Sequence, residues 1–265
     1  MDIFNNKAIG VMDSGVGGLT VLKELRKICP NENYIYFGDT KNLPYGEKTK
    51  EELVQIVKEI FDYFETQNVK AVVLACNTTS ATAYEEFKDK YSFKIYPLIQ
   101  VVSKCITQDK SISKIGIMAT QATVNSKKYT QELQNNNQNV KVVEQACPKL
   151  VPIVENRLQN CDKQAILKEY LNPILNFEPQ KIILGCTHYP YLLDDLSKLA
   201  NKELFINPAE IFAQAIKKDL EQNNLITNSK IGTTKYFASA NTNLFKKNAQ
   251  MFLNLDKQPE LVELK

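Results

Sequence analysis

The chain has 265 residues, of which 43% are hydrophobic and 24% charged, a composition typical of a globular protein with a sizeable core. Its 33 basic and 30 acidic residues leave a formal net charge of +3, and the basic residues are scattered, so nucleic acid is not expected as a partner. The apolar runs are far shorter than the roughly 18 residues of a membrane span, and the N-terminus lacks a signal-peptide pattern. We therefore expect a cytoplasmic protein without a membrane partner.

Short apolar segments alternate with amphipathic helical patterns, which predicts an α/β fold with mostly parallel sheets. Thr49 and Glu52 form a capping box at the start of one helix, and Asn207 followed by Pro208 marks the start of another. The tract Gln134–Asn139 is expected to be a polar loop. The predicted strands, in chain order, are Ile9–Met12, Tyr34–Phe37, Val72–Ala75, Ile115–Ala119, Val140–Glu144, Ile182–Gly185, Leu204–Ile206 and Lys235–Ala238.

Two segments recur along the chain in the same order and at nearly the same displacement. The stretch Ile9–Ser14 is similar to Ile115–Thr120, and Val72–Thr78 is similar to Ile182–His188. A repeat of this kind indicates duplicated structural units. We infer two pseudo-symmetric α/β lobes, each with one strand that ends near a hydroxyl-bearing residue and one that ends in cysteine.

Cys76 and Cys186 end the two cysteine-bearing strands. Functional groups gather at the carboxyl ends of parallel strands, so two facing lobes would place the thiols on opposite walls of an active-site cleft. Each cysteine precedes polar residues typical of a helix start, where backbone amides and the dipole favour the thiolate. One thiol could then act as base and the other as acid, as inversion of a stereocentre requires. Asp13 and His188 are candidate partners in proton handling.

The other reactive residue types narrow the chemistry. The chain has one histidine, His188, so a metal site built on several imidazoles is excluded and no metal is expected. None of the six cysteines forms a C-x-x-C pair, which argues against zinc-ribbon and thioredoxin-type sites. Only Arg26 and Arg157 could supply guanidinium groups. Binding of a carboxylate would therefore depend on hydroxyl and amide donors, of which the candidates are Ser14, Asn77, Thr78, Thr120, Thr123 and Thr187.

Several short motifs between residues 9 and 190 lie in one order. They are Asp13–Thr20 (DSGVGGLT), Leu43–Gly46 (LPYG), Ala75–Thr78 (ACNT), Ala119–Val124 (ATQATV), Cys147–Glu155 (CPKLVPIVE) and Leu184–Pro190 (LGCTHYP). Together they resemble the glutamate racemases of the cofactor-independent aspartate/glutamate racemase superfamily. One departure is visible, because Ala119–Thr123 replaces a Gly-Thr-x-Gly-Thr-like turn while keeping both threonines.

The resemblance implies an amino-acid racemase without a cofactor that supplies D-glutamate for peptidoglycan. Cys76 would take the α-proton from D-glutamate and Cys186 from L-glutamate, and Asp13, Glu155 and His188 would assist the thiols. The family further implies a homodimer, and lobes comprising residues 1–98 with 208–265 and residues 99–207. The residues implied to contact substrate are Asp13, Ser14, Tyr45, Gly46, Asn77, Thr78, Thr187 and His188.

Other functions remain open at this point. The nearest alternative is the same chemistry on aspartate or a hydantoin. A two-lobed module that binds an acidic metabolite without reacting would show no exchange of the α-proton. A thiol redox enzyme is disfavoured because no resolving cysteine is evident, and a Schiff-base lysine for pyridoxal phosphate is compatible with the lysine-rich composition.

Overall fold

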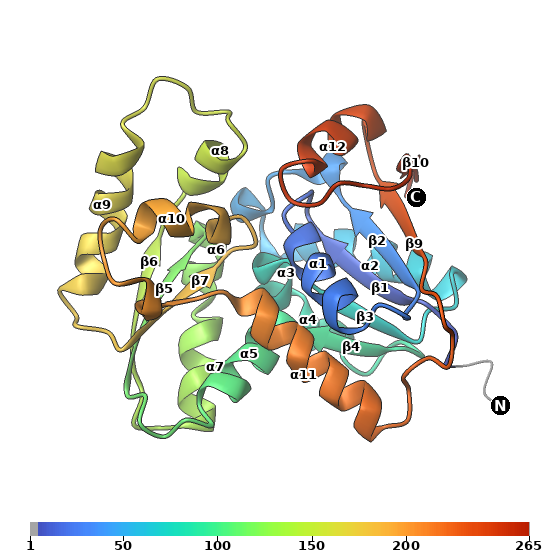
Figure 1. Ribbon diagram of the computed structural model, residues 1–265, viewed down its shortest axis with the longest axis horizontal. Helices are drawn as coiled ribbons and strands as arrows, with labels where there is room; N and C mark the ends of the chain where they lie inside the picture. The colour runs from blue at the N-terminus through green and yellow to red at the C-terminus, as the bar shows by residue number, and fades with distance from the viewer. Residues whose placement is uncertain (1–4, 265) are drawn as a thin grey trace. The chain divides into compact units, whose positions relative to one another are not determined.

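The computed structural model describes residues 5–264 (Figure 1). These residues form two compact units, the first comprising the chain up to Leu98 and again from Ala209, and the second comprising Ile99–Pro208. Each unit contains one sheet in which all the paired strands run parallel. The predicted α/β class, with two lobes and parallel sheets, is therefore confirmed. No helix in this described part is both long and apolar enough to cross a membrane.

The sheet of the first unit has the strand order β10-β9-β2-β1-β3-β4. Strand β1 pairs with both β2 and β3, and every residue of these three strands is buried, as expected where helices cover both faces. The strands are β1 Ile9–Asp13, β2 Tyr34–Gly38, β3 Ala71–Leu74, β4 Lys94–Pro97, β9 Thr234–Ala238 and β10 Glu260–Leu261. The helical segments are α1 Leu19–Ile28, η1 Thr40–Asn42, η2 Tyr45–Glu47, α2 Lys50–Thr66, α3 Asn77–Thr82, α4 Tyr84–Phe87, α11 Pro208–Gln222 and α12 Thr242–Ala249.

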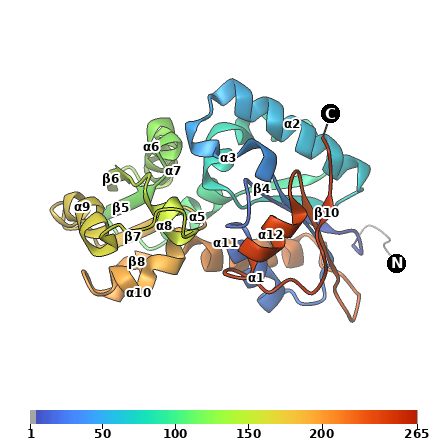
Figure 2. The ribbon, with the colours of Figure 1, turned by 90° about the horizontal axis from the view of Figure 1, so that it is seen from above.

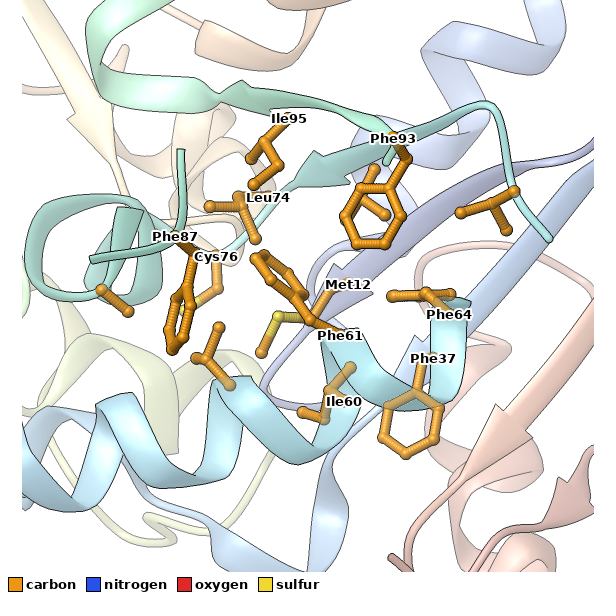
Figure 3. Packing of buried hydrophobic residues seen from close by; sticks show 14 of the residues in the cluster. Met12, Phe37, Ile60, Phe61, Phe64, Leu74, Cys76, Phe87, Phe93 and Ile95 are labelled. Carbon is orange, nitrogen blue, oxygen red and sulfur yellow. The ribbon is translucent and has the colours of Figure 1, made fainter. Parts of the chain in front are cut away.

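Helix α2 builds the largest part of the core on one face of this sheet. Its predicted capping box is confirmed, because the Thr49 hydroxyl accepts from the Glu52 amide and the Glu52 carboxylate accepts from the Thr49 amide. Phe61 and Phe64 lie on its buried face and pack with Met12 of β1 (Figure 3). Helices α1 and α11 lie on the other side of the sheet from α2 (Figure 2). The apolar face of α2 thus covers the strands of the first sheet, including β3, which leads to Cys76.

A buried ion pair joins segments at the amino ends of these strands. The Lys70 ammonium lies 2.6 Å from the Glu32 carboxylate, and both side chains are at most 1% exposed. Lys70 also donates to the backbone oxygens of Asn5 and Leu225, and Glu32 accepts from the amide of Thr227. Since a buried charge needs both a partner and hydrogen bonds, this cluster fixes four separate segments together.

The sheet of the second unit has the order β6-β5-β7-β8. Helix α9 packs tightly on it, because a Cβ atom on Gly116 of β5 would lie 2.3 Å from Ile174 Cγ2. The strands are β5 Lys114–Ala119, β6 Lys141–Ala146, β7 Lys181–Gly185 and β8 Phe205–Ile206. The helical segments are α5 Leu98–Ile106, α6 Gln121–Ser126, α7 Lys128–Asn136, α8 Leu150–Val154, α9 Lys163–Leu175, η3 Tyr189–Leu192, α10 Leu193–Leu196 and η4 Lys202–Leu204.

The internal repeat of the sequence corresponds to a repeat of topology. Four strands of the first sheet have the order β2-β1-β3-β4, and the second sheet has the matching order β6-β5-β7-β8. In this match β1 corresponds to β5 and β3 to β7, the two pairs of strands that the sequence repeat relates. Cys76 and Cys186 therefore occupy equivalent places, each just past the strand that neighbours the first strand of its unit.

Three strands and one loop differ from the sequence-based expectations. Strand β4 was not predicted because it is short and ends in a proline, and β10 consists of two exposed residues, so neither has a clear apolar pattern. Gln134–Asn136 form the last turn of α7 and are not a loop, since the amphipathic spacing of Tyr129 and Leu133 carries the helix into the polar tract. Leu204 belongs to η4 and not to the following strand.

Candidate active site

The carboxyl ends of β1 and β3 bring together the first group of predicted site residues. Asp13 is the last residue of β1, and Cys76 follows β3 by two residues. Because these strands are hydrogen-bonded neighbours, the Cys76 sulfur lies 3.9 Å from the Ser14 hydroxyl oxygen. Asn77 and Thr78 open α3 directly after the cysteine, and each is 3% exposed. We call Asp13, Ser14, Cys76, Asn77 and Thr78 the first cysteine group.

Asp13 is fully buried at the turn that leads into α1. Its carboxylate accepts a hydrogen bond from the Gly15 amide at 3.0 Å, and the Gly15 carbonyl accepts from the Tyr36 hydroxyl at 2.8 Å. A Cβ atom on Gly18 would lie 2.4 Å from the Asp13 Cβ atom. The glycine at this position therefore makes room for the carboxylate, so the turn and the acidic residue depend on each other.

The Cys76 thiol has a raised pKa, although the donors at the helix start lower it, as expected. Burial has the largest effect and the Asp13 charge adds to it, while the donor groups of Thr79 and Ser14 lower the pKa without outweighing them. Helix α3 begins where the sequence predicts, at Asn77. Desolvation of the buried sulfur thus has a larger effect on the pKa here than the donors of one short helix.

Tyr45, a predicted substrate contact, is buried, and its hydroxyl donates to the Asp39 carboxylate at 2.6 Å. Burial and the Asp39 charge raise the pKa of Tyr45 well above its ordinary value. Asp39 also accepts from Asn42 and Ser239, so it joins the loop after β2 to the end of β9. Gly46 lies beside Tyr45 within η2. The Tyr45 hydroxyl is therefore engaged in holding this loop.

The end of β7 positions the second group of predicted residues. Cys186, Thr187 and His188 form the turn between β7 and η3, and each is at most 8% exposed. The His188 Nδ1 atom lies 3.9 Å from the Cys186 sulfur and 3.4 Å from the Thr187 hydroxyl. Its Nε2 atom lies 3.0 Å from the Glu155 carboxylate. We call Cys186, Thr187, His188 and Glu155 the second cysteine group. The helix start predicted after Cys186 is a turn followed by the 3-10 helix η3, which begins at Tyr189.

Glu155 connects the imidazole to a cation. Its second oxygen lies 2.6 Å from the guanidinium of Arg157, whose side chain is 57% exposed. Burial would raise the pKa of Glu155, but the hydrogen bond and charge of His188 and the charge of Arg157 outweigh it and lower that pKa. The carboxylate is therefore ionised at neutral pH and available to orient the imidazole.

The backbone geometry at the end of α8 places Glu155 and Arg157 close together. Asn156 adopts a left-handed conformation with φ of 55°, a conformation that asparagine tolerates. The Arg157 amide donates to the Pro152 carbonyl at 2.8 Å and the Asn156 amide to the Ile153 carbonyl at 3.1 Å. This pair of bonds is a Schellman motif, which ends the helix at Glu155.

Thr120 and Thr123 lie at the end of β5, the strand that corresponds to β1. Thr120 caps α6, with its hydroxyl 3.0 Å from the Thr123 hydroxyl. Both threonines are therefore held in one capping turn.

Three residues around these groups were missed by the sequence interpretation. Asp39 follows the end of β2, so the rule used for the other strand ends would have found it. Thr79 lies in the polar run after Cys76, and Arg157 is two residues after Glu155. Sequence proximity alone does not show which groups these two side chains contact, because the contacts depend on the folded backbone. Among residues 5–264, no group of three or more His, Cys, Asp or Glu side chains could hold a metal ion.

Comparison with known proteins identifies relatives over nearly the whole chain. The family model described as Asp/Glu/Hydantoin racemase matches residues 9–216. Glutamate racemase 1 of Caldanaerobacter subterraneus subsp. tengcongensis is 38% identical over 261 residues, which cover 98% of this chain and 97% of that protein.

Solved structures agree with this relationship. A glutamate racemase isoform from Bacillus anthracis is 30% identical and superposes with a TM-score of 0.92 over 98% of both chains. A glutamate racemase from Francisella tularensis, solved in complex with D-glutamate, is 30% identical with a TM-score of 0.89, again over 98% of both chains. The predicted resemblance is confirmed by relatives that match along their full length.

Proposed function

Because the chain belongs to the Asp/Glu/Hydantoin racemase family and is an amino-acid racemase, an isomerase, we propose that it interconverts L- and D-glutamate by proton transfer between two cysteines. The equivalent positions of Cys76 and Cys186 in the repeated topology carry this proposal. Inversion at the α-carbon needs one group on each face of the substrate, and a duplicated unit supplies two related groups.

The proposed reaction inverts the α-carbon by proton transfers alone, without oxidation or reduction. Starting from D-glutamate, the Cys76 thiolate removes the α-proton and becomes a thiol, while the substrate becomes a carbanion. The Cys186 thiol then donates its proton to the opposite face, yielding L-glutamate and a Cys186 thiolate. The reverse reaction exchanges the two roles. After one forward turnover Cys76 is a thiol and Cys186 is a thiolate. A reverse turnover, or proton exchange with solvent, returns both cysteines to their starting protonation states.

Each cysteine has a different neighbour for proton handling. Asp13 is buried beside Cys76, and the His188 imidazole lies between Cys186 and Glu155. In this proposal Asp13 assists the first thiol, and the imidazole with its carboxylate assists the second. The residues that contact the substrate in this proposal are Asp13, Ser14, Tyr45, Gly46, Asn77, Thr78, Thr120, Thr123, Thr187 and His188.

Glutamate as substrate is supported by relatives of 35% to 38% identity that carry the name glutamate racemase. We further propose that the product D-glutamate serves peptidoglycan synthesis, that the enzyme acts in the cytoplasm without an added cofactor, and that it forms a homodimer. All six cysteines of the chain are free thiols, which is typical of a reducing compartment. The first lobe is taken as residues 1–98 with 208–265 and the second as residues 99–207.

Racemisation in D2O tests the mechanism. Purified protein should convert L-glutamate to D-glutamate without an added cofactor, and the product should carry deuterium at the α-carbon. Cys76→Ala and Cys186→Ala should each reduce racemisation in both directions by at least about 10³-fold, since each direction needs both thiols. Circular dichroism and mass spectrometry measure turnover and labelling.

Cys29→Ala is the matched control, because Cys29 is also buried but lies outside both cysteine groups. This variant should retain racemase activity. Full activity in Cys186→Ala would contradict the two-cysteine mechanism, and faster turnover of L-aspartate than of L-glutamate would contradict the assigned substrate.

A further inference from the structure

Thr79 is a buried residue that neither the sequence motifs nor the mechanism above uses. It is the third residue of α3, whose N-cap is Cys76, and it is fully buried. Within the part of the chain that the structure describes, its hydroxyl has no hydrogen-bond partner. A buried hydroxyl without an acceptor is unfavourable, so its retention in this position needs a reason.

The placement of Thr79 relative to the sulfur follows from helix geometry. In the first turn of a helix the amide groups lack intrahelical partners, and the Ser80 amide is the first that bonds within α3, to the Cys76 carbonyl at 3.0 Å. The side chain of an N-cap residue meets the amide and side chain of the third helical residue. The same chain uses this relation in α2, where Thr49 and Glu52 bond to each other.

We propose that Thr79 is a positioning residue for Cys76, whose hydroxyl and backbone amide donate hydrogen bonds to the sulfur when the sulfur is a thiolate. A neutral thiol is a weak acceptor, whereas a thiolate accepts strongly, so deprotonation gives the Thr79 hydroxyl the partner that it otherwise lacks. Thr79 would then stabilise the base form of Cys76 without touching the substrate.

The charged and titratable groups around the Cys76 sulfur do not stabilise its thiolate, so hydrogen-bond donors must. Among residues 5–264, Asp13 from β1, Tyr36 from β2 and Tyr45 from η2 interact electrostatically with Cys76, and none of these three is a cation. The Asp13 charge disfavours the thiolate, whereas Ser14 and Thr79 favour it. Removal of the Thr79 hydroxyl should therefore raise the pKa of the Cys76 thiol further.

The rate of Cys76 alkylation as a function of pH tests this inference directly. Iodoacetamide labelling of the full chain, resolved peptide by peptide by mass spectrometry, gives the thiolate fraction of Cys76 without any assay of racemisation. Thr79→Val should slow Cys76 alkylation at neutral pH about tenfold, the size expected for loss of a hydrogen bond to a charged group. Thr79→Ala should give the same change, and Thr79→Ser, which keeps the hydroxyl, should restore the wild-type rate.

Thr82→Val is the matched control, because Thr82 lies in the same helix but its hydroxyl donates to the Thr78 carbonyl. It should leave the Cys76 profile unchanged, and Cys186 should alkylate equally in all variants. Equal rates in wild type, Thr79→Val and Thr79→Ala would overturn the inference, as would a loss that Thr79→Ser does not restore.

The catalytic consequence rests on the proposed function and is measured separately. The rising limb of the pH profile of kcat/KM for D-glutamate should move to higher pH in Thr79→Val. If wild-type protein does not racemise glutamate but the alkylation profile shifts, the proposed function fails and the role of Thr79 stands. If racemisation is present and both profiles are unchanged by Thr79→Val, the role of Thr79 fails and the proposed function stands.

Discussion

At the scale of single residues, the two cysteines have different surroundings although their strands are related. Cys76 is surrounded by acidic and hydroxyl-bearing side chains, and burial with the Asp13 charge raises its pKa. Cys186 instead lies beside an imidazole that is bound to the ionised Glu155. The duplicated topology therefore supplies equivalent positions, while the side chains around each thiol differ.

The Glu155–Arg157 pair leads to a prediction for the acid side of the pH profile. Arg157 lowers the pKa of Glu155, so Arg157→Gln should raise that pKa, and the effect should be modest because the guanidinium is half exposed. The ionised carboxylate contributes to stability above its ordinary pKa, and this contribution is lost as the pH falls through the lower folded-state value. We therefore expect racemase activity and thermal stability of Arg157→Gln to decline at a higher pH than in wild type.

Activity and melting temperature measured between about pH 3.5 and 7 check this shift. Lys163→Gln is a suitable control, since Lys163 forms a half-exposed ion pair with Asp195, away from the second cysteine group. Identical acid limbs for Arg157→Gln and wild type would show that the guanidinium has no influence on Glu155.

At the scale of helices and strands, the two ends of the first sheet differ: the carboxyl ends carry candidate site residues and the amino ends carry a buried ion pair. The carboxyl ends of β1, β2 and β3 present Asp13, Asp39 and Cys76, whereas the amino ends are joined by the buried Lys70–Glu32 pair. Because strand register links the two ends, stability at one end preserves the geometry at the other. The contacts of Lys70 are with backbone and carboxylate groups from distant segments, so they hold the unit together without chemistry of their own.

Lys70→Met should destabilise the protein strongly, because it leaves the Glu32 carboxylate buried without a counter-charge. The expected loss is about 3–5 kcal/mol in the free energy of unfolding. The double variant Lys70→Met, Glu32→Gln should lose less than the single variant, since no buried charge then remains. Urea denaturation measures both. A single variant as stable as wild type would contradict the role assigned to the ion pair.

At the scale of the whole chain, the two units differ in how the sequence builds them. The second unit is one continuous stretch, Ile99–Pro208, whereas the first unit needs the chain from Ala209 onward to complete its sheet. Strand β9 pairs with β2 along its full length, with Tyr34 opposite Thr234 and Gly38 opposite Ala238. Ser239, directly after β9, accounts for one hydrogen bond to Asp39. The C-terminal segment is thus part of the first unit's core and of the loop that holds Tyr45.

Truncation tests whether each unit depends on the C-terminal segment for folding. A chain that ends at residue 207 lacks β9 and β10 and exposes the edge of β2, so its first unit should not fold stably. A fragment of residues 99–208 retains its complete four-stranded sheet and should fold by itself. Far-UV circular dichroism with thermal melting compares the two. Wild-type ellipticity per residue in the truncated chain, beyond what the second unit alone supplies, would show that the C-terminal strands are dispensable.

Local patterns in the sequence were sufficient to predict the fold class, the repeat and most strands. Buried parallel strands have continuous apolar stretches, and the Thr49–Glu52 capping box depends only on residues three apart, so both signals are local. The short strand β4 and the two-residue β10 gave no such signal, because pairing with a neighbouring strand, and not composition, makes them strands.

The sequence by itself determined the family, the two cysteines and their place at strand ends, because motif order and strand periodicity are properties of neighbouring residues. Only the tertiary structure decided the electrostatic surroundings of Cys76 and the links from Cys186 through His188 and Glu155 to Arg157. The physical reason is that desolvation and hydrogen bonding act between groups that are distant along the chain and become adjacent only when the strands pair and the helices pack.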